Sequence, residues 1–205
     1  MSSFENRSLK QMIIKSMEIK RLMIHVNEYS RPGRFIGDDI RGIVIHYTGN
    51  PGSTPEQNIK YFDSLRLQAG LPGSPKPKNP RYASAHFFVG TDGDVWQCIP
   101  TSEMAYHVGA ASYKKDAVAI LGSYPNSHTL GIELCHKTVT GEFTEETLEA
   151  ASELASLLLI EYGLTPEKNL FRHYDVTGKM CPLYFVNHEE QWKLFIERVK
   201  AKMNK

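Results

Sequence analysis

The segment GIVIHYTGNPGSTPEQ, residues 42–57, indicates the fold class of this chain. Its first six residues are mostly β-branched or apolar on both faces, which is typical of a strand buried in the centre of a sheet. A loop rich in glycine and proline follows. Thr54, Pro55 and Gln57 then form the signature of a helix start with a capping box. A buried strand that leads into a capped helix favours an α/β domain.

Further strands are expected on both sides of this segment. The clearest pair flanks an Asp-Gly turn at residues 92–93 and predicts a hairpin, because such turns match the twist of two antiparallel strands. The expected strands are residues 22–26, 85–89, 95–99, 129–135 and 170–173.

Two more helices are expected in the second half of the chain. The first runs from Thr144, its cap, to about Tyr162, and Gly163 ends it. The second begins at Asn187 in a capping box with Glu190, and its inward face carries Trp192, Phe195 and Val199. Together these elements predict a single α/β domain with a mixed central β-sheet flanked by helices.

Composition excludes several classes of function. The chain has 205 residues, and 24 Lys and Arg stand against 23 Asp and Glu, for a net charge of +1. A nucleic-acid-binding protein normally carries a basic face, and no such concentration of charge is present, so we expect no nucleic-acid partner. No apolar run approaches the roughly 18 residues of a membrane span, so we expect no membrane insertion. We also expect a monomer.

The N-terminal residues 1–20 are expected to be an appendage of uncertain role, with the folded domain at 21–205. They mix charged residues with short apolar pairs and lack the continuous apolar region of a signal peptide. Met17 is an alternative start. The three cysteines, an odd number, fit a reducing compartment or a role in metal binding or catalysis.

One local cluster of residues indicates chemistry. In RHYDVTGKMCP, residues 172–182, His173 and Cys181 are joined by a loop that contains glycine, so an imidazole and a thiolate can converge on one zinc ion. The alternative is a hydrogen-bonded structural histidine and a cysteine that fills the core. His46 lies near the end of the buried strand and is a third candidate, although spacing alone does not connect it to His173.

Four motifs resemble one known family in their order along the chain. They are GIVIHYTGNPG at 42–52, SAHFFVGTDGDVWQCIP at 84–100, LGIELC at 130–135 and RHYDVTGKMCP at 172–182, with AYHVGAAS at 105–112 as a matching loop. This set resembles the zinc-dependent N-acetylmuramoyl-L-alanine amidases related to phage lysozyme-type amidases and peptidoglycan recognition proteins. The resemblance extends from about residue 22 to residue 199.

The resemblance implies roles for six residues. His46, His173 and Cys181 match the ligands of one zinc ion per chain. Glu133 matches an acidic residue proposed to activate the attacking water, and Lys179 matches a lysine thought to stabilise the developing oxyanion. His107 matches a position that lines the substrate groove. Other members carry a tyrosine where this chain has Ala85, and that difference increases the importance of Glu133.

The resemblance implies a zinc amidase that cleaves the bond between N-acetylmuramic acid and L-alanine of peptidoglycan, in a groove at the sheet rim. Two alternatives remain. One is a non-catalytic module that recognises muropeptides, and the other is an amidase that acts on soluble muropeptides in cell-wall recycling. We expect a lysin or autolysin of the prophage type. It would stay in the cytoplasm until release, or leave by a route without a signal peptide, and act on the cell wall.

Overall fold

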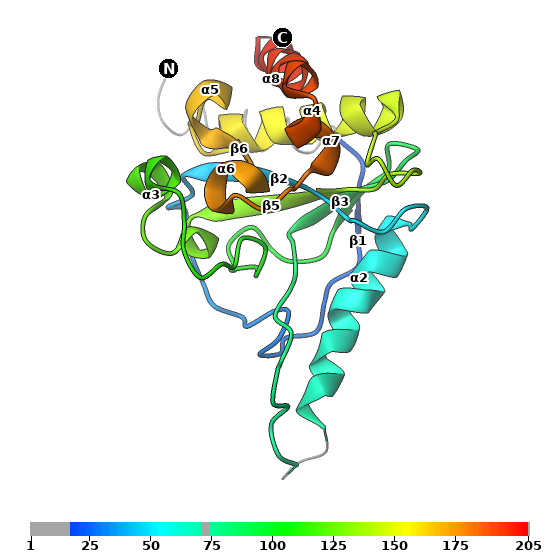
Figure 1. Ribbon diagram of the computed structural model, residues 1–205, viewed down its shortest axis with the longest axis vertical. Helices are drawn as coiled ribbons and strands as arrows, with labels where there is room; N and C mark the ends of the chain where they lie inside the picture. Colours follow the sequence, from blue (N-terminus) through cyan, green and yellow to red (C-terminus); the bar gives the residue numbers. More distant parts are fainter. Residues whose placement is uncertain (1–16, 71–73, 205) are drawn as a thin grey trace.

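A six-stranded mixed sheet forms the centre of the computed structural model, which describes residues 17–70 and 74–204 (Figure 1). The strand order is β1-β4-β3-β5-β2-β6, and all neighbouring strands are parallel except the antiparallel pair β3 and β4. The strands are β1 (Ile19–Arg21), β2 (Gly42–Tyr47), β3 (Phe87–Val89), β4 (Val95–Gln97), β5 (Thr129–Leu134) and β6 (Leu170–Arg172). The predicted α/β class with a mixed sheet is confirmed.

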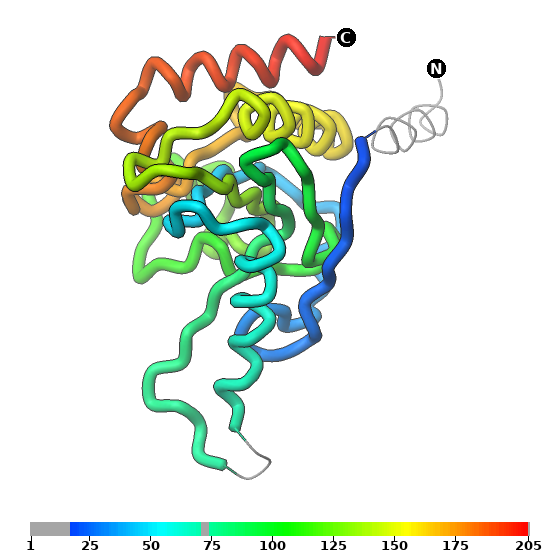
Figure 2. The backbone as a smooth tube through the Cα atoms, turned by 90° about the vertical axis from the view of Figure 1, so that its right-hand side faces the viewer, coloured from blue at the N-terminus to red at the C-terminus, as the bar shows by residue number. Residues whose placement is uncertain are grey.

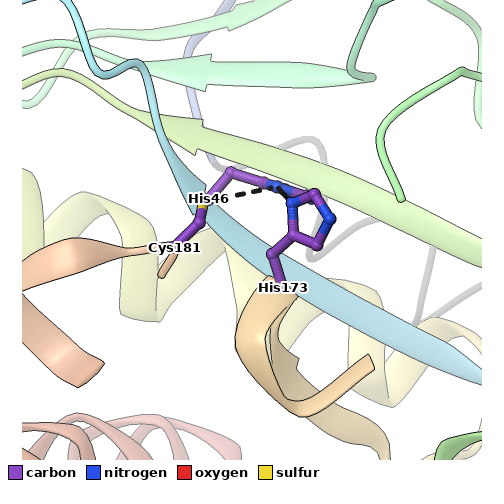
Figure 3. Close-up of side chains that lie close together, drawn as sticks. All are labelled: His46, His173 and Cys181. Atoms are coloured by element: carbon purple, nitrogen blue, oxygen red, sulfur yellow. Dashed lines mark hydrogen bonds between the residues drawn. The ribbon is translucent and has the colours of Figure 1, made fainter. Parts of the chain in front are cut away.

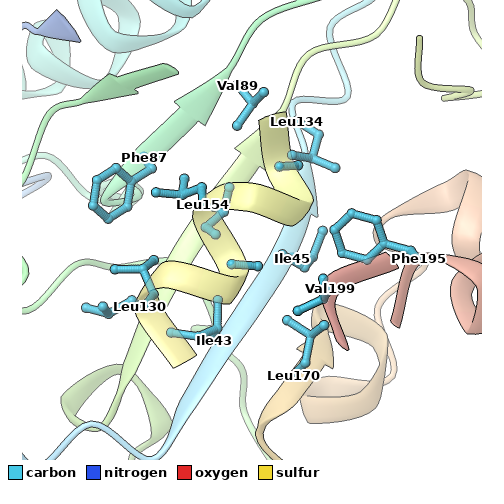
Figure 4. Packing of buried hydrophobic residues seen from close by; sticks show 14 of the residues in the cluster. Ile43, Ile45, Phe87, Val89, Leu130, Leu134, Leu154, Leu170, Phe195 and Val199 are labelled. Atoms are coloured by element: carbon cyan, nitrogen blue, oxygen red, sulfur yellow. The ribbon is translucent and has the colours of Figure 1, made fainter. Parts of the chain in front are cut away.

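Helices cover one face of the sheet. The long helices α4 (Glu145–Glu161) and α8 (Glu189–Met203) pack there, as Figure 1 shows. Side chains alternate along β2, so Ile43 and Ile45 point into this apolar layer, where they meet residues such as Leu154 and Phe195 (Figure 4). Val44 and His46 therefore point to the opposite face.

The opposite face is covered by loops and shorter elements. These are α2 (Pro55–Ser64), η1 (Leu65–Ala69), α3 (Lys115–Leu121), η2 (Pro125–Ser127) and α6 (His173–Thr177). The short helices α5 (Pro166–Asn169) and α7 (Leu183–Asn187) lie instead on the side of α4 and α8, where both contact α8. Helix α2 and the chain that returns after residue 73 extend away from the sheet as an arm (Figure 2).

Local capping chemistry explains where two helices begin. The Thr54 hydroxyl accepts the Gln57 N–H at 3.2 Å, and the Gln57 side chain accepts the Thr54 N–H at 3.0 Å, so the predicted capping box is confirmed. The Thr144 hydroxyl likewise accepts the Thr147 N–H at 3.1 Å at the start of α4. Each contact satisfies an N–H group that the first helical turn leaves without a partner.

The first strand and the last helix begin at other residues than the sequence predicts. The strand expected at 22–26 lies at Ile19–Arg21, because pairing with β4 starts there, so the sheet begins two residues before the expected domain start at 21. The capping box expected at Asn187 is wrong: Pro182 opens the short helix α7, which ends at Asn187, and α8 begins at Glu189 with no side-chain cap. Residues 1–16 of the expected N-terminal appendage lie outside the described residues, and the alternative start at Met17 stays a prediction.

Candidate metal centre

The sheet brings the first two candidate ligands together. Strand β6 lies beside β2, with Ile45 paired to Arg172, so the next residues, His46 and His173, are neighbours across the two strands. The Tyr174 N–H then donates to the carbonyl oxygen of Cys181 at 2.9 Å and folds the following loop back onto the start of α6. Three residues that are far apart in sequence thus meet at the ends of β2 and β6.

The three side chains form a compact buried group (Figure 3). His46 Nδ1 lies 3.1 Å from His173 Nδ1 and 3.8 Å from Cys181 Sγ, and all three ligand atoms lie within 4.8 Å of one another. Each residue is at most 4% exposed. Ligand atoms on one zinc ion lie about 2.0–2.1 Å (nitrogen) or about 2.3 Å (sulfur) from it, so neighbouring ligand atoms lie roughly 3–4 Å apart, and both distances from His46 Nδ1 fall in that range. The residues present therefore fit a zinc ion.

The electrostatics of this group also suit a metal. Burial lowers the pKa of His46 well below its ordinary value, and burial lowers the pKa of His173 to about 4, so both imidazoles are neutral near pH 7. A neutral imidazole is the form that binds a metal. Burial raises the pKa of the Cys181 thiol to about 12, and a bound cation reverses that effect because it stabilises the thiolate.

Arg172 and Asp175 hold His173 in place from outside the group. The Asp175 carboxylate accepts the Arg172 backbone N–H at 2.8 Å and the Arg172 guanidinium at 2.8 Å. The same guanidinium donates to the Phe185 carbonyl oxygen at 3.0 Å. Asp175 thus caps α6 and does not contact an imidazole. The signal for this role was the charged pair at 172 and 175, which flanks His173 in the sequence.

His107 lies directly behind His46. The ring is buried, with 6% exposure, and its Nδ1 is 3.0 Å from His46 Nε2. His86 lies beside His107 with a ring-to-ring distance of 5.7 Å, so these imidazoles form a buried row with those of His46 and His173. His107 also borders the cavity described next, and its expected role in substrate binding stays a prediction.

A cavity of about 810 Å³ opens over the metal-ligand group. Glu133 projects into it from β5, where it is paired with His46 across the two strands, and its Oε2 atom is buried without a hydrogen-bond partner among the described residues. Burial raises the pKa of Glu133 to about 8, and the positive charge of Lys179 opposes that shift. Lys179 itself is exposed and lies at the edge of the cavity.

The structure thus brings all six of the predicted site residues to the lining of one cavity, and three of them form the His/His/Cys group. The sequence analysis did not identify the residues of the outer wall, where the arm contributes Tyr61, Arg81 and Tyr82. The Arg81 guanidinium lies 5.8 Å from the centre of the Tyr61 ring. Tyr61 lies on helix α2 and the other two lie in the irregular chain that returns to the sheet, so no shared motif or period in the sequence could mark them as one wall.

Fold and site together define an α/β domain with a buried His/His/Cys group under an open cavity, and comparisons with known proteins give its family. The profile of the N-acetylmuramoyl-L-alanine amidase family matches residues 36–183, well over half of the chain. This chain therefore belongs to the N-acetylmuramoyl-L-alanine amidase family.

Individual relatives agree with the family match. A probable N-acetylmuramoyl-L-alanine amidase of Bacillus licheniformis is 35% identical over 178 residues, covering 87% of this chain and 46% of the relative. The N-acetylmuramoyl-L-alanine amidase BlyA of Bacillus subtilis (strain 168) is 33% identical over 187 residues, covering 88% and 46%. The chain thus spans about half the length of the curated relatives it matches.

A solved structure shares the fold. The solution structure of the PlyG catalytic domain superposes with a TM-score of 0.67 at 21% identity, and the match covers 91% of this chain and 96% of that one. Across residues 17–70 and 74–204, none of the helices has both the length and the apolar character to cross a membrane.

Proposed function

We propose that this domain is a zinc-dependent amidase that cleaves the bond between N-acetylmuramic acid and L-alanine in peptidoglycan. The observation that carries the proposal is the group formed by His46, His173 and Cys181 beneath a cavity that also holds Glu133. Members of the matching family are generally zinc-dependent amidases, which supports zinc as the metal. One ion per chain would be held by His46 Nδ1, His173 Nδ1 and Cys181 Sγ.

When bound, the zinc ion supplies positive charge that acidifies the attacking water and polarises the scissile carbonyl. Glu133 acts as the base: its carboxylate takes one proton from the water as the oxygen attacks the carbonyl carbon. The same group then gives that proton to the departing nitrogen of L-alanine. The products are a free carboxyl on the lactyl group of the sugar and a free amine on the peptide.

Two features of Glu133 support this role. Its Oε2 atom has no hydrogen-bond partner among the described residues, so it is available to a water molecule in the cavity. Burial raises its pKa, and nearby positive charge favours the carboxylate form that a base requires. Lys179 supplies one such charge, and its position at the cavity edge also suits stabilisation of the negative charge that develops on the carbonyl oxygen.

The substrate is proposed to be wall peptidoglycan, because named relatives are N-acetylmuramoyl-L-alanine amidases. The cavity is large enough for a sugar and adjoining peptide, since ligand pockets of about 300–1,000 Å³ bury most of a drug-sized molecule. Action on the cell wall follows from that substrate. The monomeric state and the route by which the chain reaches the wall stay predictions.

The test combines metal content with product analysis. Purified protein is assayed for zinc per chain and incubated with insoluble peptidoglycan, and separately with soluble muropeptides, while new L-alanine amino groups are quantified. We expect about one zinc per chain and new L-alanine amino groups from insoluble peptidoglycan. Chelation should abolish this activity, and added zinc should restore it. Cys181→Ser should lose zinc and activity, whereas Cys98→Ala, at a buried thiol outside the ligand group, should keep about one zinc per chain.

Other outcomes would overturn parts of the proposal. Cleavage of soluble muropeptides alone would identify a recycling amidase. A protein that binds zinc and binds to peptidoglycan but produces no new amino groups would be a recognition module. A folded protein that binds no zinc would refute the ligand assignment for His46, His173 and Cys181.

A further inference from the structure

The His46 ring can present only one of its nitrogens to a metal, and the group on the other side of the ring decides which one is free. A neutral imidazole carries a proton on either Nδ1 or Nε2 and binds a metal through the unprotonated nitrogen. The inference below concerns that proton and rests on the proposed metal site. The residues that control it are His107 and Thr129.

The hydrogen bonds of His107 can be assigned from Thr129. His107 Nε2 lies 3.3 Å from the Thr129 carbonyl oxygen, which can only accept a hydrogen bond. It also lies 3.1 Å from the Thr129 hydroxyl, whose single hydrogen is donated to the Pro125 carbonyl oxygen at 2.8 Å. Both contacts therefore require the hydrogen to be on His107 Nε2.

The position of the hydrogen on His107 determines the position of the hydrogen on His46. A neutral His107 with its hydrogen on Nε2 has an unprotonated Nδ1, and this atom lies 3.0 Å from His46 Nε2. One of the two nitrogens must donate, so His46 Nε2 carries the hydrogen. His46 Nδ1 is then unprotonated, and it is the atom that faces His173 Nδ1 and Cys181 Sγ.

We propose that Thr129, His107 and His46 form a hydrogen-bonded relay that holds His46 in the Nε2-protonated tautomer and so prepares its Nδ1 for zinc. His107 is a positioning residue in this relay, acting on the metal through His46. The neighbouring His86 does not compete for this role, because its Nδ1 accepts the Gly131 N–H at 3.0 Å and its Nε2 is 2.9 Å from the Glu103 carbonyl oxygen.

The surroundings of His107 are built to hold its ring at this position. The Asn126 side-chain oxygen accepts the backbone N–H groups of His107 and Val108 at 3.2 and 3.0 Å, and Asn126 is 1% exposed. On β5, a Cβ atom at Gly131 would lie 2.7 Å from ring atoms of His107. The absence of a side chain at Gly131 thus gives the ring its space against the sheet.

The first experiment measures the tautomer of His46 directly. In metal-free, ¹⁵N-labelled wild-type protein at pH 7.5, two-bond ¹H–¹⁵N correlation spectra distinguish protonated Nδ1 from protonated Nε2, and His46→Gln identifies the signals. We expect His46 and His107 both to be protonated on Nε2. A His46 protonated on Nδ1 would overturn the relay, and this measurement requires neither zinc nor turnover.

The second experiment measures zinc affinity by competition with a chelator. His107→Leu removes the acceptor and is expected to weaken zinc binding roughly 10- to 100-fold, the usual cost of losing a partner of a metal ligand. His107→Asn keeps an oxygen acceptor near the position of Nδ1 and should bind zinc within about threefold of wild type. Thr129→Val retains the carbonyl acceptor and is expected to have a smaller effect than His107→Leu.

The outcomes separate this proposal from the proposed function. Equal zinc affinity in wild type and a folded His107→Leu would overturn the relay even if the protein is an active amidase. If His107→Leu does not fold, the comparison of His107→Asn with wild type and the tautomer of His46 still decide. If the tautomers and zinc affinities are as expected but no new L-alanine amino groups form on peptidoglycan, the relay stands and the amidase activity is refuted.

Discussion

Glu133 lines the cavity, and its buried Oε2 atom has no hydrogen-bond partner within residues 17–70 and 74–204. We expect Glu133→Gln to keep zinc binding and lower turnover roughly 10²- to 10⁴-fold, because the amide has the same shape but cannot take a proton. Zinc content per chain measures zinc binding, and the rate at which new L-alanine amino groups form on peptidoglycan measures turnover. Glu190→Gln, at a largely exposed side chain on α8, is the matched control. Unchanged turnover in Glu133→Gln would exclude Glu133 as the base.

Glu133 should also make the stability of the metal-free protein depend on pH. Burial raises its pKa from 4.5 to about 8, so the folded state favours the protonated carboxyl. That contribution is fully present below about pH 4.5 and is lost as the pH rises through about 8. Relative to Glu133→Gln, wild type should lose roughly 2–4 kcal/mol of unfolding free energy between pH 5 and pH 9. Urea unfolding of both proteins at the two pH values provides the measurement, and parallel pH profiles would contradict it.

Among the elements, helix α4 depends on its N-cap residue, Thr144. The Thr144 hydroxyl accepts the Thr147 N–H at 3.1 Å and lies 2.8 Å from the Thr91 carbonyl oxygen, so it joins α4 to the β3–β4 turn. Thr144→Ala should lower the free energy of unfolding by about 1 kcal/mol, within a range of about 0.5–2. Thr144→Ser keeps the hydroxyl and is expected to retain most of the stability. Denaturant unfolding of the three proteins tests this, and equal midpoints for alanine and threonine would refute it.

Boundaries of helices and strands that neighbouring residues set could be predicted from the sequence, whereas boundaries that depend on distant contacts could not. The Thr54–Gln57 capping box was predictable because its hydrogen bonds join residues within one helical turn. The similar pattern at Asn187 misled, because Pro182 begins a short helix that uses Asn187 as its last residue. A local pattern does not show which of two overlapping helices the packed chain adopts.

In the candidate site, too, local spacing could be predicted from the sequence and distant contacts could not. The spacing of His173 and Cys181 indicated a shared metal ion, but His46 joined them only through a family resemblance, because its contact with His173 requires β2 to lie beside β6. The position of His107 behind His46 could not be predicted either. It depends on the space left by Gly131 in a strand that follows His107 in the sequence.

The molecule as a whole should be sensitive to acid when it contains no zinc. Burial lowers the pKa of His46 and His107 well below 6.5 and that of His86 and His173 to about 4. These four imidazoles are neutral in the folded protein but bind protons near pH 6.5 when unfolded. Their contribution to stability is therefore present above about pH 6.5 and is lost as the pH falls towards 4.

The expected slope is up to about 5 kcal/mol per pH unit if all four histidines contribute, since each can add about 1.4 kcal/mol. Denaturant unfolding at pH 7, 6 and 5 measures it. His188→Gln, at a half-exposed side chain, should leave the slope unchanged. A free energy of unfolding that stays constant between pH 6.5 and pH 5 would show that these imidazoles do not remain neutral in the folded state.

The three proposed metal ligands are synthesised at widely separated times. His46 is separated by 127 positions from His173 and by 135 from Cys181. At about 5–20 residues per second, a ribosome adds Cys181 roughly 7–27 s after His46. A nascent or prematurely terminated chain that lacks Cys181 has an incomplete ligand set. The candidate metal site therefore has all three of its residues only after most of the domain has been synthesised.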